Sequence, residues 1–572
     1  MKFSERTVFW SIAIVCAVSR FASRARSLWD WDESLFCLAM RSYDVTLHHP
    51  HPPGFPAYIA LGRMVRLVVG DDFRSLQTIN LIAGMLLFPA VYMLARELGL
   101  RFSTSVIAGA LCAFFPNVWF YGGTAFSDVP SITLVVFAAA LLLRGRRDTA
   151  SYLFGTFLLA VAIGIRPQNA LVGLFPLLLA TRRRKPGEIA LAALIGAVVD
   201  FAAFGGAVMA TGSFDAYRSA IRAHSEYISI VDSFRSPLRP ALWRLIALFF
   251  AKQYSSPALS IITTVFVVIA IVNAVRIRSR PMLYNALTFG PVAVAAWLFL
   301  DRYSVNRFSI GYIPMFAIFA AEGIRSASVS LAGSLPSRRR IEAGIAIALI
   351  LAFIAYALPA FRPVRRDIAP SVLAVEAAKT HFNPQTDDLF VAADMFPFVD
   401  YLLPDVPYTR VWDERALPLS RDRKSPRLIA EIVEMNPEGF VFRREHGHLW
   451  NISRRHYYGA AYATMTRFSN FASGWYPPER SGQEEWRWMA AESTTILPAS
   501  QGESLLRLGF TANPPARVTV ALNGRQVDAF EASGETQREW HIANPIDGSN
   551  TLVITAGRDH ALHVRYLSWA PY

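Results

Sequence analysis

Three carboxylates follow the first apolar segment of the chain at close spacing, in the sequence Trp29-Asp30-Trp31-Asp32-Glu33. Carboxylates beside a membrane segment are costly unless they face water or a ligand. A carboxylate among aromatic rings can have a raised pKa, which suits a general base that takes a proton from a hydroxyl group. The alternative is an interfacial belt, in which Trp is common and the neighbouring acids are only solvated.

A histidine cluster follows in the same loop, in the sequence His48-His49-Pro50-His51-Pro52-Pro53. Three histidines could hold a metal ion, but the prolines favour an extended chain on which the rings need not converge. We therefore expect one imidazole, that of His51, near an anionic phosphate rather than a metal site made by these histidines alone. A divalent cation held by the acidic residues stays open.

Acids and arginines also stand at the ends of later apolar segments. Asp128 opens the segment 129–143, where the positive end of a helix dipole would stabilise it. Arg166 lies between the segments 149–165 and 168–181. Arg302 and Arg307 lie at the junction of the segments 282–300 and 304–322. Arginine binds phosphate through two N–H groups at once. Each residue alone could be a solvated loop charge, but together they place acids and arginines at one membrane face.

A polytopic α-helical membrane protein would have to position these residues. The chain has 572 residues, of which 53% are hydrophobic and 13% aromatic. A spanning helix needs roughly 20 apolar residues, so about eleven spans are predicted. They lie at 7–23, 76–95, 103–120, 129–143, 149–165, 168–181, 189–211, 257–275, 282–300, 304–322 and 341–360. Residues 240–252 are too short to span and predict an interfacial or re-entrant helix.

The net charge of +14 is distributed in basic clusters between the apolar segments, as at Arg144–Arg147 and Arg182–Lys185. Such clusters are typical of cytoplasmic loops, and they argue against a nucleic-acid partner. They predict a multi-pass protein of the cell membrane, surrounded by membrane lipids. The N-terminus would be cytoplasmic and the C-terminal domain extracytoplasmic, in the periplasm if the cell is Gram-negative. Arg20, Arg24 and Arg26 are the exception, because at the outer end of the first helix they would snorkel or face an anionic ligand.

The chain beyond the last predicted span reads as water-soluble and divides in two. Residues 361–485 alternate apolar strands such as Leu389–Ala393 with helix-like stretches at Phe396–Leu403 and Arg427–Met435, which predicts an extracytoplasmic α/β region. Residues 486–572 alternate apolar and polar positions between Asn-Gly and Asp-Gly turns, which predicts a β-sandwich-like module. All the cysteines precede these regions, so no disulfide framework is expected there.

The motifs together resemble those of the dolichyl-phosphate-mannose protein mannosyltransferase family. That family includes the bacterial aminoarabinose transferases of lipid A and belongs to the GT-C class of membrane glycosyltransferases. The resemblance covers about residues 7–330, and the C-terminal part matches no motif. The pieces that carry it are Asp32-Glu33 followed by His51-Pro52-Pro53, then Ser127-Asp128-Val129-Pro130, and then Arg302-Tyr303, Arg307-Phe308 and Tyr312-Ile313-Pro314.

This resemblance implies a GT-C-like catalytic domain at residues 1–360. The enzyme would be a hexosyl- or pentosyltransferase that takes its sugar from a polyprenyl-phosphate donor, with a glycan, a lipid or a protein as acceptor. Asp32 matches the family's first-loop acid, proposed as the base or acceptor-binding group, and Asp128 matches the second acidic position. His51 departs from the pattern, because relatives often have a lysine there and a neutral imidazole is a weaker partner for phosphate.

The chemistry of such a transfer agrees with these residue types. It needs a deprotonated acceptor and a stabilised leaving phosphate. The predicted catalytic acids are Asp32, Glu33 and Asp128. The predicted ligands of the donor phosphate are His51, Arg166, Arg302 and Arg307, and no metal ligand is predicted among them. The alternative is a polytopic transporter or a lipid-linked sugar flippase, although the sequence has no inverted repeat of broken helices.

Overall fold

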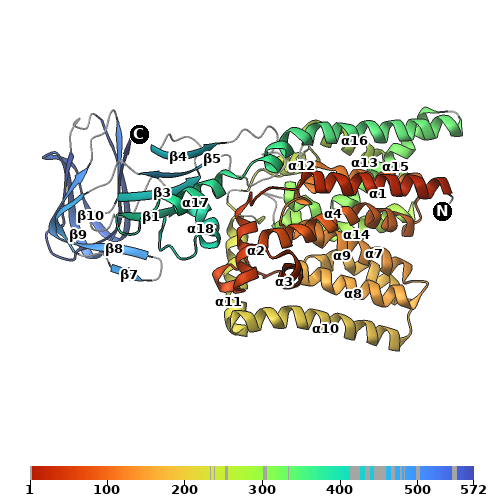
Figure 1. The fold of residues 1–572 in the computed structure, drawn as a ribbon, viewed down its shortest axis with the longest axis horizontal. Helices are drawn as coiled ribbons and strands as arrows, with labels where there is room; N and C mark the ends of the chain where they lie inside the picture. Colours follow the sequence, from red (N-terminus) through yellow and green to blue (C-terminus); the bar gives the residue numbers. More distant parts are fainter. Residues whose placement is uncertain are drawn as a thin grey trace. The chain divides into compact units, whose positions relative to one another are not determined.

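A computed structural model of the protein describes residues 3–231, 233–237, 239–251, 256–299, 306–332, 334–411, 425–431, 438–443, 459–464, 470–476, 479–481, 484–497, 503–543 and 550–571. The described residues form two compact units, one up to Ile368 and one from Ala369 onward. The first unit is helical and the second is rich in strands (Figure 1). The predicted fold class, a helical membrane part followed by a β-rich region, is confirmed.

The first unit contains long apolar helices joined by shorter ones. Its described helices are α1 (Phe3–Ser23), α2 (Trp31–Arg41), α3 (Pro56–Val69), α4 (Asp72–Glu97), α5 (Phe102–Phe114), α6 (Pro116–Tyr121), α7 (Asp128–Arg144), α8 (Thr149–Ile165), α9 (Asn169–Thr181), α10 (Pro186–Thr211), α11 (Phe214–Val231), α12 (Leu242–Ala251), α13 (Pro257–Arg276), α14 (Arg280–Phe299), α15 (Ile313–Leu331) and α16 (Leu335–Arg366). Two short 3-10 helices, η1 (Val45–Leu47) and η3 (Asn306–Gly311), lie between them.

Six of the described helices are long and apolar enough to cross a membrane: α1, α4, α10, α13, α14 and α16. Three shorter apolar helices, α5, α8 and α9, accompany them. Large apolar side chains such as Leu194 and Phe201 on α10 and Val265 on α13 are exposed. Lipid, and not water, is the favourable surrounding for such faces. The chain is therefore a multi-pass membrane protein.

Two predicted spans have different limits in the structure. The span predicted at 103–120 divides into α5 and α6 at Phe115-Pro116, because proline lacks an N–H donor and keeps the residue before it extended. The span predicted at 304–322 begins only at Ile313, after η3. Pro314 stands in the first turn of α15, the helical position that tolerates proline.

The connection between the spans predicted at 7–23 and 76–95 contains the α-helices α2 and α3. α2 has polar residues at its start and buries Phe36, Cys37 and Met40 further along. α3 begins at Pro56 and ends at Val69, and the Gly70 that caps it has a φ of 80°, the left-handed conformation that glycine adopts at a helix end. The segment predicted as an interfacial helix at 240–252 forms α12.

The second unit begins with helices and a five-stranded sheet. Its elements are α17 (Pro370–His381), β1 (Asp387–Ala392), α18 (Phe396–Leu402), β2 (Thr409–Val411), β3 (Ser425–Glu431), β4 (Glu438–Arg443) and β5 (Gly459–Thr464). The strand order is β2-β1-β3-β5-β4, with β1 parallel to β2 and β3. The helix predicted at Arg427–Met435 is wrong over its described part, because Leu428 and Ala430 pack with Phe390 of β1 in one buried cluster.

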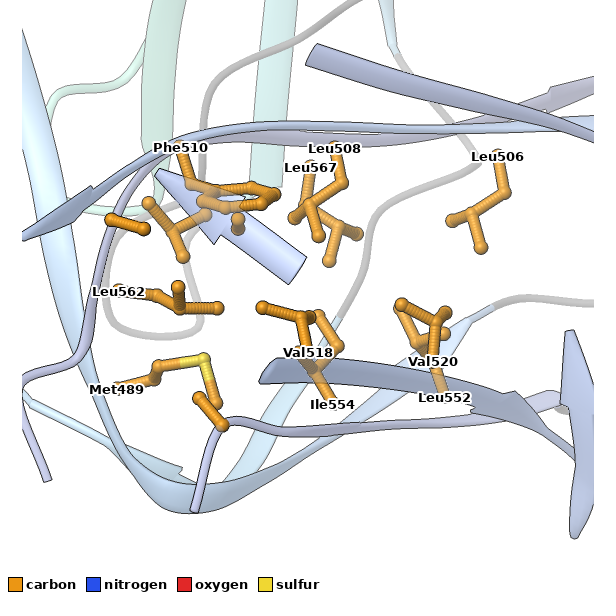
Figure 2. Close-up of a cluster of buried hydrophobic side chains, with 14 of the residues drawn as sticks. Met489, Leu506, Leu508, Phe510, Val518, Val520, Leu552, Ile554, Leu562 and Leu567 are labelled. Carbon is orange, nitrogen blue, oxygen red and sulfur yellow. The ribbon is translucent and has the colours of Figure 1, made fainter. Parts of the chain in front are cut away.

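A seven-stranded sheet follows. Its strands are β6 (Asn470–Trp475), β7 (Glu479–Ser481), β8 (Glu484–Leu497), β9 (Ser504–Leu522), β10 (Arg525–Ile542), β11 (Asn550–Thr555) and β12 (Leu562–Pro571). The first half of β9 pairs with β12 and its second half with β11, while β8 pairs with both, so the sheet folds back on itself. Figure 2 shows Leu506, Leu508 and Phe510 on one side of the buried cluster and Val518 and Val520 on the other.

The predicted domain limits fall inside elements of this structure. The limit at residue 360 lies within α16, which continues to Arg366. The limit between residues 485 and 486 lies within β8.

Candidate active site

The first turn of α2 points its two adjacent acids in different directions. Asp30 caps the helix and accepts a hydrogen bond from the backbone N–H of Asp32 at 3.0 Å. The Glu33 carboxylate turns back and accepts from the backbone N–H groups of Trp29 at 2.7 Å and of Asp30 at 3.1 Å. This reciprocal arrangement is a capping box, and it fixes the entry of the chain into α2.

Glu33 also ties α2 to a distant segment. Its second carboxylate oxygen accepts from the backbone N–H of Ala125 at 2.8 Å, just before α7. The side chain is fully buried, and burial raises the pKa of Glu33 to about 8, although the three backbone donors act in the opposite direction. Glu33 therefore lies in the wall of the site as a brace between α2 and the start of α7.

Asp32 points in a different direction from Glu33, because consecutive helical residues are rotated by about 100°. Its Oδ2 lies 2.5 Å from a terminal nitrogen of Arg307, which belongs to η3. Its Oδ1 lies 3.9 Å from Nδ1 of His51. Only 8% of Asp32 is exposed, so this ion pair is largely removed from water.

Asp128 and Arg166 continue the row of charges. Asp128 is the first residue of α7, as predicted, and its Oδ2 accepts from Arg166 at 2.8 Å. Arg166 follows α8 as its C-terminal cap and also donates from Nε to the hydroxyl of Ser127 at 2.9 Å. Nε of Arg307 lies 3.9 Å from the same Asp128 oxygen. The side chains thus alternate in sign in the order Asp32, Arg307, Asp128 and Arg166.

A cavity of about 290 Å³ adjoins this row of charges. Asp128, Arg166 and Arg307 contribute polar groups to its lining. Another part of its wall is apolar and comes from α14, through Val292, Ala295, Ala296 and Phe299. The cavity can therefore take a ligand that combines an anionic group with an apolar chain.

The electrostatic surroundings keep both arginines charged and leave the nearby imidazole neutral. Although burial lowers the pKa of Arg307, the carboxylates of Asp32 and Asp128 raise it above its ordinary value. Burial lowers the pKa of Arg166, but a guanidinium stays protonated in proteins. Burial lowers the pKa of His51 to about 3, and the neighbouring Asp32 only partly offsets this effect. At neutral pH, His51 can contribute hydrogen bonds but no charge.

The structure brings most of the predicted site residues together. Asp32, His51, Asp128, Arg166 and Arg307 form one connected group, and Glu33 stands behind it. Arg302, the remaining predicted phosphate ligand, lies outside the described residues.

Two parts of the site carry no signal in the sequence. The ring of His224 on α11 lies 5.9 Å from that of His51, between centroids, although α11 belongs to a polar connection with no recognisable motif. The apolar residues of α14 also line the cavity, but they resemble those of any other span. Within the described part of the chain, no three His, Cys, Asp or Glu side chains are placed to share a metal ion.

Comparison with protein families gives one match. Residues 50–205 match the model of the family described as dolichyl-phosphate-mannose-protein mannosyltransferase. This stretch contains His51, Asp128 and Arg166. No curated protein sequence matches the chain.

Several solved structures match the fold of this chain at low sequence identity. ArnT from Cupriavidus metallidurans, solved with undecaprenyl phosphate, is 14% identical over 72% of this chain and 87% of its own, with a TM-score of 0.47. AglB, an oligosaccharyltransferase from Archaeoglobus fulgidus solved with an inhibitory peptide and a dolichol-phosphate, is 12% identical over 99% and 98%, with a TM-score of 0.48. The arabinofuranosyltransferase AftD from Mycobacteria is 11% identical over 99% of this chain and 59% of its own, with a TM-score of 0.46.

The family match confirms the resemblance that the motifs indicated, and it favours a glycosyltransferase over the transporter or flippase. The matched stretch runs from the histidine cluster through α7 and α8 into α10. Over residues 50–205, this membrane protein is similar in sequence to the dolichyl-phosphate-mannose-protein mannosyltransferases.

Proposed function

We propose that the protein is a membrane glycosyltransferase that moves a sugar from a polyprenyl-phosphate donor to an acceptor hydroxyl at the extracytoplasmic face of the cell membrane. The observation that carries this proposal is the alternating row of two carboxylates and two guanidinium groups beside a cavity with an apolar wall. A lipid-linked sugar phosphate has the same combination of features, because its phosphate is anionic and its prenyl chain is apolar.

The donor phosphate would bind Arg166 and Arg307, and its prenyl chain would lie along α14. The two arginines balance the charges of Asp32 and Asp128 before the donor binds. During transfer, the bond between the anomeric carbon and the phosphate oxygen breaks, and its electron pair stays on the phosphate. Fixed guanidinium groups stabilise the additional negative charge at this moment, which is where catalytic electrostatics has its largest effect.

Asp32 would act as the general base. As the acceptor oxygen bonds to the anomeric carbon, the hydroxyl proton passes to the Asp32 carboxylate. Asp32 lies 2.5 Å from Arg307. The base would therefore be adjacent to the arginine that binds the leaving phosphate. Neutral His51 would orient the acceptor or the phosphate through a hydrogen bond, and Glu33 would hold α2 in place.

The strand-rich unit would bind the acceptor. Aromatic rings gather on β8 and β12 and beside them, with Trp488 stacked on His563 at 5.1 Å and Tyr476 stacked on His560 at 4.1 Å between centroids. The indole N–H groups of Trp486 and Trp488 both donate to the Glu479 carboxylate. Flat rings beside carboxylates suit sugars, which offer apolar C–H faces and hydroxyl donors. We therefore propose a glycan acceptor.

The test is a transfer assay with the purified full chain in nanodiscs. A polyprenyl phosphate carrying a radiolabelled sugar is added with glycans extracted from the cell envelope, and the label on the glycan and the released polyprenyl phosphate are both measured. We expect the two products to appear in equal amounts. If proteoliposomes instead move the labelled donor across the bilayer and transfer no sugar, the protein is a flippase and the proposal is wrong.

A further inference from the structure

Five arginines line a second pocket of the helical unit. Arg24 and Arg26 follow α1, Arg74 lies in the first turn of α4, and Arg365 and Arg366 lie in the last turn of α16. The pocket has a volume of about 450 Å³ and shares no lining residue with the catalytic cavity. The mechanism above gives it no role.

Backbone carbonyls hold this cluster in place. Arg26 donates from its backbone N–H to the carbonyl of Val364 at 3.0 Å and from its guanidinium to that of Arg366 at 2.6 Å. The Arg74 guanidinium donates to the carbonyls of Ala25 at 3.2 Å and Arg26 at 2.7 Å. The ends of three helices are therefore fixed together with their cations already assembled.

Asp71 attracts Arg74 electrostatically, but ion pairs do not neutralise the charges of the cluster within the described residues. Within the described part of the chain, none of the five guanidinium groups forms an ion pair with a carboxylate. The closest acid in sequence to Arg74, Asp72, pairs with Arg41 and Arg66 instead. Asp71 accepts a bond from the Arg74 backbone N–H at 2.7 Å as the cap of α4. Like charges held this close repel one another unless an anion joins them. Arg20, on the same helix end, differs because it is buried and donates to the carbonyl of Ala113.

The surroundings of the pocket are those of a lipid. α1 and α16 lie side by side, and both are candidates for crossing the membrane (Figure 1). Val18 and Phe21 in the C-terminal half of α1 and Leu358 in the C-terminal half of α16 expose apolar side chains. The Arg24 guanidinium lies over the ring of Phe21 at 4.0 Å. A ligand that seats an anion among the arginines can therefore lay acyl chains on these helices.

We propose that this pocket binds the phosphate headgroup of an anionic membrane lipid. Arginine suits this group because its planar fork of N–H donors matches phosphate oxygens in pairs. The pocket is also linked to the catalytic helix. Gln77 donates to the carbonyls of Ala25 at 2.8 Å and Gly123 at 2.9 Å, and Glu33 of α2 binds Ala125 of the same segment. A bound lipid would therefore stabilise the connection that leads into α2.

The test measures binding of radiolabelled phosphatidylglycerol to the full chain in a non-ionic detergent, and needs no transfer activity. The variant is Arg24→Gln with Arg365→Gln, because neither guanidinium donates to a backbone carbonyl of another element within the part of the chain that the structure describes. The matched control is Arg339→Gln with Arg340→Gln, which removes two exposed charges from the other end of α16. Loss of two charge-assisted contacts should weaken binding at least about tenfold in the variant and leave the control unchanged.

Competition experiments distinguish a lipid headgroup from a soluble phosphate as the ligand of the pocket. Phosphatidylcholine, which is zwitterionic, should compete poorly, and so should soluble glycerol phosphate, which lacks acyl chains. Bound phosphatidylglycerol should also raise the unfolding temperature of the wild type but not of the variant. Equal loss in variant and control, or no loss in either, would overturn the proposal. Displacement by glycerol phosphate as effective as that by the lipid would overturn the assignment to a lipid.

Discussion

Replacing Asp32 by Asn should separate donor binding from sugar transfer. The amide keeps the size of the side chain but can no longer accept the proton of the acceptor hydroxyl. Loss of a positioned general base costs typically about 10²–10⁴-fold in rate. We therefore expect turnover to fall by about that factor.

The same substitution should not weaken donor binding, although it slows transfer. The two carboxylates and two guanidinium groups of the row sum to zero, so removing one carboxylate leaves a charge of one positive unit. Two unit charges about 4 Å apart interact with about 4 kcal/mol at an effective dielectric constant of about 20, which sets an upper limit for the repulsion that Asp32 exerts on the phosphate. Arg307, released from Asp32, becomes available to the donor. The affinity for polyprenyl phosphate should therefore stay equal or increase.

Stability should decline moderately. Breaking a buried ion pair can cost about 3–5 kcal/mol when it leaves a charge without compensation. Arg307 keeps Asp128 at 3.9 Å and lies over the ring of Phe126 at 4.7 Å, so the cost should remain below that range. Asp72→Asn is the matched control. It breaks a comparable pair, with Arg41 at 2.8 Å and Arg66 at 3.1 Å, away from the cavity.

The assay is single-turnover transfer in nanodiscs, together with titration of polyprenyl phosphate and thermal unfolding. We expect Asp32→Asn to be folded, to bind donor and to transfer sugar at least about 10²-fold more slowly, while Asp72→Asn loses stability and keeps its rate. Near-normal turnover of Asp32→Asn would refute its role as base. A parallel loss of rate in both variants would mean that ion-pair disruption, and not the missing base, is the cause.

Four further variants test the remaining assignments. Arg166→Gln should weaken polyprenyl-phosphate binding about 10- to 100-fold, since a charge-assisted bond contributes about 1.5–3 kcal/mol, and an unchanged affinity in the same titration would contradict this. Glu33→Gln should lower the free energy of unfolding by about 1–3 kcal/mol, because an amide cannot accept from all three backbone N–H groups, and a denaturation midpoint equal to that of the wild type would exclude the brace. His51 has a folded pKa of about 3 against an ordinary 6.5, so the unfolded chain takes up a proton that the folded chain excludes. The wild type should thus lose up to about 1.4 kcal/mol of stability per pH unit as the pH falls below 6.5, and His51→Asn should flatten this slope in thermal unfolding, whereas parallel curves would argue against a buried neutral imidazole. Trp486→Ala with Trp488→Ala should weaken glycan binding about tenfold without changing donor affinity, and full retention on a glycan column would remove the acceptor assignment.

The sequence by itself determined the class of the protein. Runs of about 20 apolar residues predict helices wherever they occur, because a lipid-embedded backbone must satisfy its own hydrogen bonds. The types of the site residues were also visible, since acids and arginines at the ends of apolar segments are costly without a ligand. The helix predicted at Arg427–Met435 was wrong, because its local pattern did not show that this segment pairs with β1 and is buried in a sheet.

Only the tertiary structure decided which of these residues face the site and which hold its helices in place. Asp32 and Glu33 are neighbours in the chain and equivalent in type, yet one faces Arg307 and the other accepts three backbone N–H groups. The partner that draws Asp32 toward the site lies 275 residues away, in η3. Local spacing carries no information on such a contact, because it depends on how the helices pack. The five arginines of the second pocket likewise come from three separate helix ends, and packing alone makes them one site.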